Sequence, residues 1–229
     1  MKERNLFFLV QVLICVFISA QASSPPAHET PAPPPASETK SAPDFELLQN
    51  RFGGITIIAY KGTEKNVVIP ETIGGLPVTI IGVKAFYKKD LSSVTIPETV
   101  VTIEPLAFAE NHFESVDISG CVSIGYEAFA GNQISTLLLS ENLSSIGPRA
   151  FINNKISAIT LPGKITNIGK DAFAGNPLSS VKVAANRNLF ASQGFEPSFV
   201  NYYVGTGRSA GVYVKDGRIW SLRNDESHE

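Results

Sequence analysis

Five Ala-Phe pairs recur along the middle of the chain at an almost constant interval. They are Ala85-Phe86, Ala107-Phe108, Ala128-Phe129, Ala150-Phe151 and Ala172-Phe173, and the phenylalanines lie 22, 21, 22 and 22 residues apart. A fixed period of this length is typical of a solenoid, in which each repeat forms one coil and neighbouring coils share a core. The period therefore predicts a stack of coils that presents surface rather than a pocketed active site.

Apolar positions repeat with the same period after each Ala-Phe pair. They follow an L-x-x-V-x-I frame, whose last part alternates as in a short strand with one buried face. The frames are Leu91/Val94/Ile96, Phe113/Val116/Ile118, Ile134/Leu137/Leu139, Ile156/Ile159/Leu161 and Leu178/Val181/Val183, after an earlier half-repeat of Val67/Ile69. The pattern predicts six parallel strands, one per coil, with one turn of helix at each Ala-Phe pair.

Asparagine and cysteine occupy two further repeated slots. Stacked amides can bond the backbone of adjacent turns, and asparagine follows four of the phenylalanines at the same distance, at Asn111, Asn132, Asn154 and Asn176. Cys121 takes an apolar slot that recurs before each Ala-Phe pair and is filled elsewhere by Val78, Val100, Leu143 and Ile165. These slots predict a structural amide ladder and a buried cysteine that acts as a small hydrophobe.

The combined frame, L-x-x-V-x-I-P followed by I-G-x-x-A-F-x-x-N, resembles the BspA-like, or treponemal-type, leucine-rich repeat family from about Ile55 to Val183. The resemblance implies a leucine-rich repeat solenoid of six coils with β-hairpin caps and a parallel sheet on its concave side. The family commonly has cysteine where this chain has its four repeated asparagines, a departure that leaves the fold prediction unchanged. Family members are exported or surface proteins of host-associated microbes, often implicated in adhesion, and the family has no catalytic residues to transfer.

The N-terminal 22 residues have the composition of an export signal. A basic start precedes an apolar run at 6–18, which is shorter than the roughly 20 residues of a membrane span, and Ala20-Gln21-Ala22 fits a cleavage site. We expect a mature chain that begins near Ser23, is exported and is not an integral membrane protein. Lipid attachment at Cys15 is an alternative, which the bulky residue before this cysteine disfavours.

The segments outside the repeats differ from them in composition. The predicted parts are an export signal (1–22), a proline-rich disordered tether (23–43), an N-terminal β cap (44–60), the solenoid (61–185), a C-terminal β-hairpin cap (186–223) and a disordered tail (224–229). Within the C-terminal cap, residues 199–204 have the composition of a strand. Residues 211–222 predict a hairpin that turns at Asp216-Gly217.

Charge and histidine content argue against several classes of function. A formal net charge of -2 disfavours nucleic acid and anionic membrane surfaces, because both need a basic patch. Only His112 of the three histidines falls in the predicted folded body, so a histidine metal site or a Ser-His-Asp triad is poorly supported. The chain also has no phosphate-binding loop. We therefore expect no enzyme activity, cofactor or metal.

The exposed side of the predicted strands is the candidate binding face. Strand alternation places one side chain per coil on it, namely Val68, Thr95, Asp117, Leu138, Thr160 and Lys182. Trp220 is a further candidate because tryptophan is favoured at binding hot spots, although it also fits a residue that covers the last coil. Six strands about 4.8 Å apart and four residues at about 3.3 Å give a face of about 310 Å², below the roughly 800 Å² per partner of a standard interface.

Two functions fit these features. The first is an exported, non-catalytic interaction module that binds a protein, such as a host or envelope component, in the manner of an adhesin. The second is a small-ligand protein that holds an apolar or glycan ligand near Leu138 or against a cap. An exposed concavity lined by apolar side chains would favour the second function. Periplasmic, cell-surface and secreted locations are all compatible with the sequence.

Overall fold

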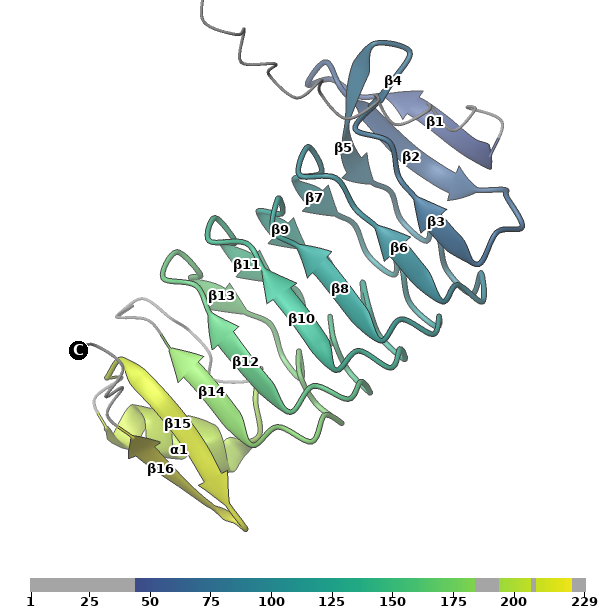
Figure 1. Cartoon of the computed structure of the whole chain (residues 1–229). Coiled ribbons are helices and arrows are strands. Elements are labelled where there is room, and N and C mark those ends of the chain that lie inside the picture. The colour runs from purple at the N-terminus through teal and green to yellow at the C-terminus, as the bar shows by residue number, and fades with distance from the viewer. Residues whose placement is uncertain (1–43, 184–193, 207–208, 224–229) are drawn as a thin grey trace, which may run out of the picture. The chain divides into compact units, whose positions relative to one another are not determined.

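The computed structural model describes residues 44–183, 194–206 and 209–223, which belong to one compact unit. The predicted export signal, proline-rich tether and C-terminal tail lie outside these residues. The described part of the chain winds into stacked coils with a cap at each end (Figure 1), so the predicted leucine-rich repeat solenoid is confirmed.

Six short strands lie in one row along the stack, as the repeated frame predicts, and Figure 1 shows their arrangement. They are β3 (Asn66–Val68), β6 (Ser93–Thr95), β8 (Ser115–Ile118), β10 (Thr136–Leu139), β12 (Ala158–Leu161) and β14 (Ser180–Val183). We call them the main strand row. β3 pairs with β6, β8 with β10 and β12 with β14, all parallel and in register. Among the described residues no backbone ladder joins β6 to β8 or β10 to β12.

A second strand row, which the sequence reasoning missed, runs along another side of the coils. It contains β5 (Leu76–Ile81), β7 (Thr102–Ile103), β9 (Ser123–Ile124), β11 (Ser145–Ile146) and β13 (Asn167–Ile168), which pair in parallel. Four of these strands have only two residues, too few for a period of two to be visible in the sequence. The row buries one isoleucine per coil, at Ile81, Ile103, Ile124, Ile146 and Ile168.

The Ala-Phe segments form turns, so the prediction of one helical turn at each pair is wrong. The residue before each alanine has a φ between 50° and 61°, at Lys84, Leu106, Glu127, Arg149 and Asp171. A residue in the left-handed conformation interrupts a right-handed helix, and here the N–H groups that follow it point along the stack. The N–H of Phe129, for example, donates to the carbonyl of Ala150 in the next coil at 2.8 Å. The corners thus join neighbouring coils by backbone hydrogen bonds.

The phenylalanines of these corners stack into a continuous aromatic column. Successive ring centroids from Phe86 to Phe173 are 4.8, 5.2, 5.4 and 5.5 Å apart, and the rings are nearly parallel. The column extends at one end to Tyr60 in the N-terminal cap, 5.4 Å from Phe86, and at the other to Phe195, 5.1 Å from Phe173. Each ring of the repeats is at most 3% exposed. The predicted core role of these residues is confirmed.

The amide ladder forms as predicted at the corner beside the column. Asn132 donates through Nδ2 to the carbonyl of Phe108 in the preceding coil at 3.0 Å and to that of Phe129 in its own coil at 3.1 Å. Its Oδ1 accepts the N–H of Phe113 at 3.3 Å. Asn154 repeats this arrangement one coil further along. Each amide therefore satisfies backbone groups that the turn leaves without partners inside its own coil.

The N-terminal cap is a hairpin of β1 (Phe45–Gln49) and β2 (Ile55–Tyr60), which pair antiparallel. β2 continues in parallel into β5, and β4 (Thr72–Ile73) adds an antiparallel pair to β5. Phe45 and Tyr60 lie buried beside Phe86 and extend the apolar core past the first coil. The hairpin thereby covers apolar surface that the end of the stack would otherwise expose to water.

The C-terminal cap contains a helix at residues for which the sequence predicts a strand. α1 spans Pro197–Gly205, so the predicted strand at 199–204 is wrong. Pro197 opens the helix at a position where the absent N–H costs nothing, and the carbonyl of Glu196 accepts the N–H groups of Phe199 and Val200. Phe199 and Tyr203 lie one turn apart and are both buried. This helical spacing prevails over a β-rich local composition.

The predicted C-terminal hairpin forms and adds to the main strand row. β15 (Gly211–Asp216) and β16 (Ile219–Arg223) pair antiparallel on either side of Gly217, whose φ is 59°. β15 also pairs antiparallel with β14 of the last coil. The sheet of β12 and β14 therefore continues through β15 to β16 (Figure 1).

Candidate functional site

The main strand row presents the six predicted side chains on one exposed face. Strand pairing sets Val68 beside Thr95, Asp117 beside Leu138 and Thr160 beside Lys182. All six are exposed, Val68 to 51% and Leu138 to 55%. Their neighbours along the strands point inward and are buried in four coils, at Val67, Val116, Ile159 and Val181. The structure thus brings six of the seven candidate residues together.

Trp220 does not belong to this face. Its side chain is 3% exposed, and its ring packs edge-on against Phe199 at 4.9 Å between centroids. The indole Nε1–H donates to Oε1 of Glu196 at 2.7 Å. Trp220 is therefore a core residue of the C-terminal cap, because alternation along β16 turns it inward while its neighbours face outward.

Glu196 is the polar centre of the C-terminal cap. Its carboxylate accepts hydrogen bonds from Nζ of Lys215 at 2.7 and 2.8 Å, besides the one from Trp220. Partial burial acts to raise the pKa of Glu196, but the bonds from Lys215 and Trp220 outweigh it and lower the pKa. These contacts connect the start of α1 to both strands of the hairpin, so they hold the parts of the cap together.

The C-terminal hairpin enlarges the candidate face beyond the six coils. Lys182 on β14 pairs with Val212 on β15, and Val212 pairs with Arg223 on β16. Alternation turns the buried Tyr213 inward and leaves these three residues on the outward side. The sequence contained a signal for this extension, the predicted hairpin at 211–222, but the order of the strands in the sheet was not evident from it.

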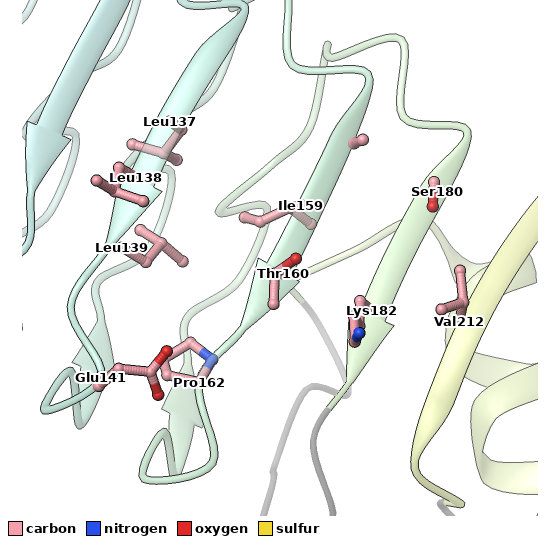
Figure 2. A pocket seen from close by; sticks show the side chains of 11 residues that line it. Leu137, Leu138, Leu139, Glu141, Ile159, Thr160, Pro162, Ser180, Lys182 and Val212 are labelled. Atoms are coloured by element: carbon pink, nitrogen blue, oxygen red, sulfur yellow. The ribbon is translucent and has the colours of Figure 1, made fainter. Parts of the chain in front are cut away.

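A trough of about 530 Å³ crosses the outward face between β10 and β15 (Figure 2). Small side chains on β12 and β14, including Ala158, Thr160 and Ser180, form its floor. Leu138 and Val212 stand at its two sides, with Lys182 beside Val212. The trough therefore exists because three of the four outward side chains on β12 and β14, those of Ala158, Thr160 and Ser180, are small.

The side chains of β10 that face inward also reach the trough. Leu137 and Leu139 are half-buried, whereas the matching residues of β8, Val116 and Ile118, are 3% and 1% exposed. The difference coincides with the missing backbone ladder between β10 and β12. Apolar surface that β8 buries completely is thus accessible at β10. The matching residues of β6, Val94 and Ile96, are also half-buried, at the other step without a ladder.

The other polar features of the described residues fit structural roles. Burial raises the pKa of the Cys121 thiol to about 12, and its Sγ donates to the carbonyl of Val100, so the prediction of a buried cysteine is confirmed. Lys65 and His112 both contact Asp90 and lower its pKa, but all three side chains are at least half exposed. Within the described ranges no group of three or more His, Cys, Asp or Glu is placed to hold a metal ion.

No helix within the part of the chain that the structure describes is both long and apolar enough to cross a membrane.

The family model of the BspA type Leucine rich repeat region matches residues 79–199 in six copies, just over half of the chain. No curated protein matches the chain.

The chain is similar to several solved structures of bacterial proteins. A leucine-rich repeat protein of Bacteroides ovatus is 25% identical with a TM-score of 0.53, and the match covers 64% of this chain and 41% of that one. The leucine-rich repeat protein of T. pallidum is 22% identical with a TM-score of 0.46, covering 62% of this chain and 69% of that one. The pneumococcal vaccine antigen PcpA is 19% identical with a TM-score of 0.48, covering 62% and 48%. The chain thus spans less than half of two of these three proteins.

Proposed function

The chain belongs to the BspA type leucine-rich repeat family, and from this premise we propose that it is an exported, non-catalytic module that binds a protein through the outward face of its main strand row. The family is typical of surface proteins and of protein-interaction modules, and it is typically non-catalytic. We propose a host or envelope protein as the partner, in the manner of an adhesin.

One observation carries the proposal, namely the apolar trough on an otherwise hydroxyl-rich and charged face. Leu138 is 55% exposed at its edge, and Leu137 and Leu139 contribute half-buried apolar surface from below. Covering such surface releases about 25 cal/mol per Å² of apolar area. A partner that places an apolar side chain in the trough would gain this energy, and the flanking charges would set its orientation.

The proposal includes export, which depends on the composition of residues 1–22. Family members are surface or exported proteins. We propose that the protein reaches the periplasm, the cell surface or the medium, and that it is not inserted in the membrane once the signal is removed. Protease added to intact cells measures surface exposure directly, because a periplasmic protein would survive and a surface protein would be cleaved.

A binding panel with matched variants tests the proposed face. Purified protein is immobilised and exposed to matrix and envelope proteins by surface plasmon resonance, as wild type, as Leu138→Asp and as Val101→Asp. Val101 is also an exposed apolar residue, at 40%, but it lies beside the second strand row. We expect a partner whose binding is lost in Leu138→Asp and kept in Val101→Asp. Equal binding by both variants would contradict the proposed face.

Binding of a small apolar or glycan ligand is the second candidate function, and the trough favours it. Its volume of about 530 Å³ falls within the roughly 300–1,000 Å³ of typical ligand sites. NMR chemical shifts of Leu137, Leu138 and Leu139 methyl groups during titration with fatty acids and oligosaccharides would detect such a ligand. Saturable shifts confined to these methyls would support the small-ligand function, and their absence would argue against it.

A further inference from the structure

The outward residues of six adjacent strands form a self-complementary series. Read across the face from β8 to β16, they are an acid, an apolar residue, a hydroxyl, a base, an apolar residue and a base. The residues are Asp117, Leu138, Thr160, Lys182, Val212 and Arg223. Strand register places Asp117 level with Leu138, and it places Thr160, Lys182, Val212 and Arg223 level with one another. No ladder joins β10 to β12, and Leu138 and Thr160 correspond because they occupy the same position of two successive repeats.

We propose that a second copy of this chain is a partner of this face. The two copies meet face to face about a two-fold axis that runs along the strands between β12 and β14. Such an axis reverses the order of the strands, so each residue contacts its counterpart from the other end of the series. The inference rests on the proposed function, because it assigns binding to the same outward face.

This symmetry creates three kinds of pair, one between opposite charges, one between apolar residues, and one in which the hydroxyl of Thr160 lies opposite the ammonium of Lys182 and can accept a hydrogen bond from it. Asp117 of one copy lies opposite Arg223 of the other, and Leu138 lies opposite Val212. Both members of the charged pair are exposed in the single chain, so they can reach across the interface. An axis perpendicular to the strands would instead set Asp117 near Asp117 and Arg223 near Arg223. Repulsion between like charges therefore selects the first arrangement over the second.

The outward residues two positions along each strand from this series also allow the two copies to approach closely. They are uncharged and mostly small, at Ser115, Thr136, Ala158, Ser180, Val214 and Ser221. The same axis sets Thr136 opposite Val214 and Ala158 opposite Ser180. This level carries no charge to desolvate, and its hydroxyl groups need hydrogen-bond partners across the interface.

The size of the face predicts a weak dimer. Six strands about 4.8 Å apart and four residues at about 3.3 Å cover about 310 Å², against about 800 Å² per partner in a standard interface. The dimer should therefore form only at high protein concentration. Its charged pairs are near the edge of the contact, so added salt should weaken it.

Sedimentation equilibrium over a concentration series measures the dimer dissociation constant of the wild type and of variants in which the charges of Asp117 and Arg223 are reversed. Asp117→Arg and Arg223→Asp each place like charges opposite one another. Each should weaken association about tenfold, because a symmetric dimer contains the pair twice. The double variant restores opposite charges and should recover the wild-type dimer. Glu64→Arg makes the same change of charge before β3, outside the six strands, and should leave association unchanged.

Three outcomes would overturn self-association through this face. They are a monomer at every concentration, a dimer that Asp117→Arg does not weaken, and single variants that weaken the dimer without recovery in the double variant. Circular dichroism checks that each variant keeps the wild-type fold. The binding panel with Leu138→Asp is independent of this result. If the protein is a monomer but binds another protein, and Leu138→Asp abolishes that binding, the dimer is refuted and the proposed function is retained.

Discussion

The aromatic column and the main strand row are built from the same coils, but their side chains differ in how much they vary. Five coils place phenylalanine in the column with alanine before it, and four of them place the same asparagine beside it. On the outward face the coils present a different residue at almost every step, from Val68 through Asp117 to Lys182. Interior packing constrains the residues of the column, whereas the outward residues can vary and so determine which partner the face binds.

The physical basis of this difference is the number of neighbours that each side chain must fit. A phenylalanine of the column is enclosed by the rings of the coils before and after it, so a change of volume affects three coils. An outward residue such as Leu138 contacts water on one side and can change without disturbing the stack. Removing residues from the two regions should therefore have very different consequences.

Phe129→Ala should have the largest effect, because it interrupts the column. The ring is fully buried and stacks on Phe108 at 5.2 Å and on Phe151 at 5.4 Å. The cavity left by a buried phenylalanine costs about 3–5 kcal/mol. Urea denaturation followed by far-UV circular dichroism measures the loss. A change no larger than that of an exposed substitution would contradict the column.

Asn132→Ala should have the next largest effect, because it removes one step of the amide ladder. The carbonyls of Phe108 and Phe129 and the N–H of Phe113 would lose a partner. The two carbonyls keep the amides of Asn111 and Asn154 as donors, so only the N–H of Phe113 is left without a partner, and a buried group in that state costs about 1–3 kcal/mol. Asn142→Ala, at an exposed asparagine, is the control and should cost much less in the same assay.

Glu196→Gln should have a smaller effect, confined to the C-terminal cap. It removes the ion pair with Lys215, and because that pair is partly exposed we expect about 1 kcal/mol or less. The pKa of Glu196 is lowered in the folded state, from an ordinary value of 4.5. Its stabilisation is therefore present above pH 4.5 and is lost as the pH falls through the folded-state pKa. The stability difference between wild type and variant should shrink below pH 4.5, and a constant difference would contradict this role.

Leu138→Asp should have the smallest effect on stability and the largest on binding. The side chain is 55% exposed, and exposed substitutions usually change stability by less than about 0.5 kcal/mol. The urea midpoint should therefore match wild type while binding of the partner is lost. A variant that unfolds as readily as Phe129→Ala would show that the outward face also holds the stack together.

The repeated interior was predictable because each coil must satisfy the same constraint. The period alone located Phe86 and its equivalents in the core, and alternation located Leu138 and Lys182 on the outward face. The turn at each corner was not predictable as such, because the left-handed Lys84 and Leu106 are residues without a turn signature. Local composition predicts a strand at 199–204, but α1 forms there because Phe199 and Tyr203, one helical turn apart, are both buried in the cap.

The trough and the extended face could not be read from local sequence. The trough depends on the missing ladder between β10 and β12 and on small outward residues two coils wide. The extension depends on β15 pairing with β14, a contact that forms only in three dimensions. Trp220 illustrates the same point, because only the register of β16 decides whether it faces water or the core.

Deletion of one whole coil tests the central claim most directly. Removing residues 134–155 takes out β10, β11 and Phe151, and it joins two segments that occupy the same position in their coils. If interchangeable coils share one aromatic column, Phe129 will stack on Phe173. The shortened chain will then show the wild-type circular dichroism spectrum and a single cooperative urea transition, at lower stability. An unfolded or aggregated product, or a loss of cooperativity, would contradict the account.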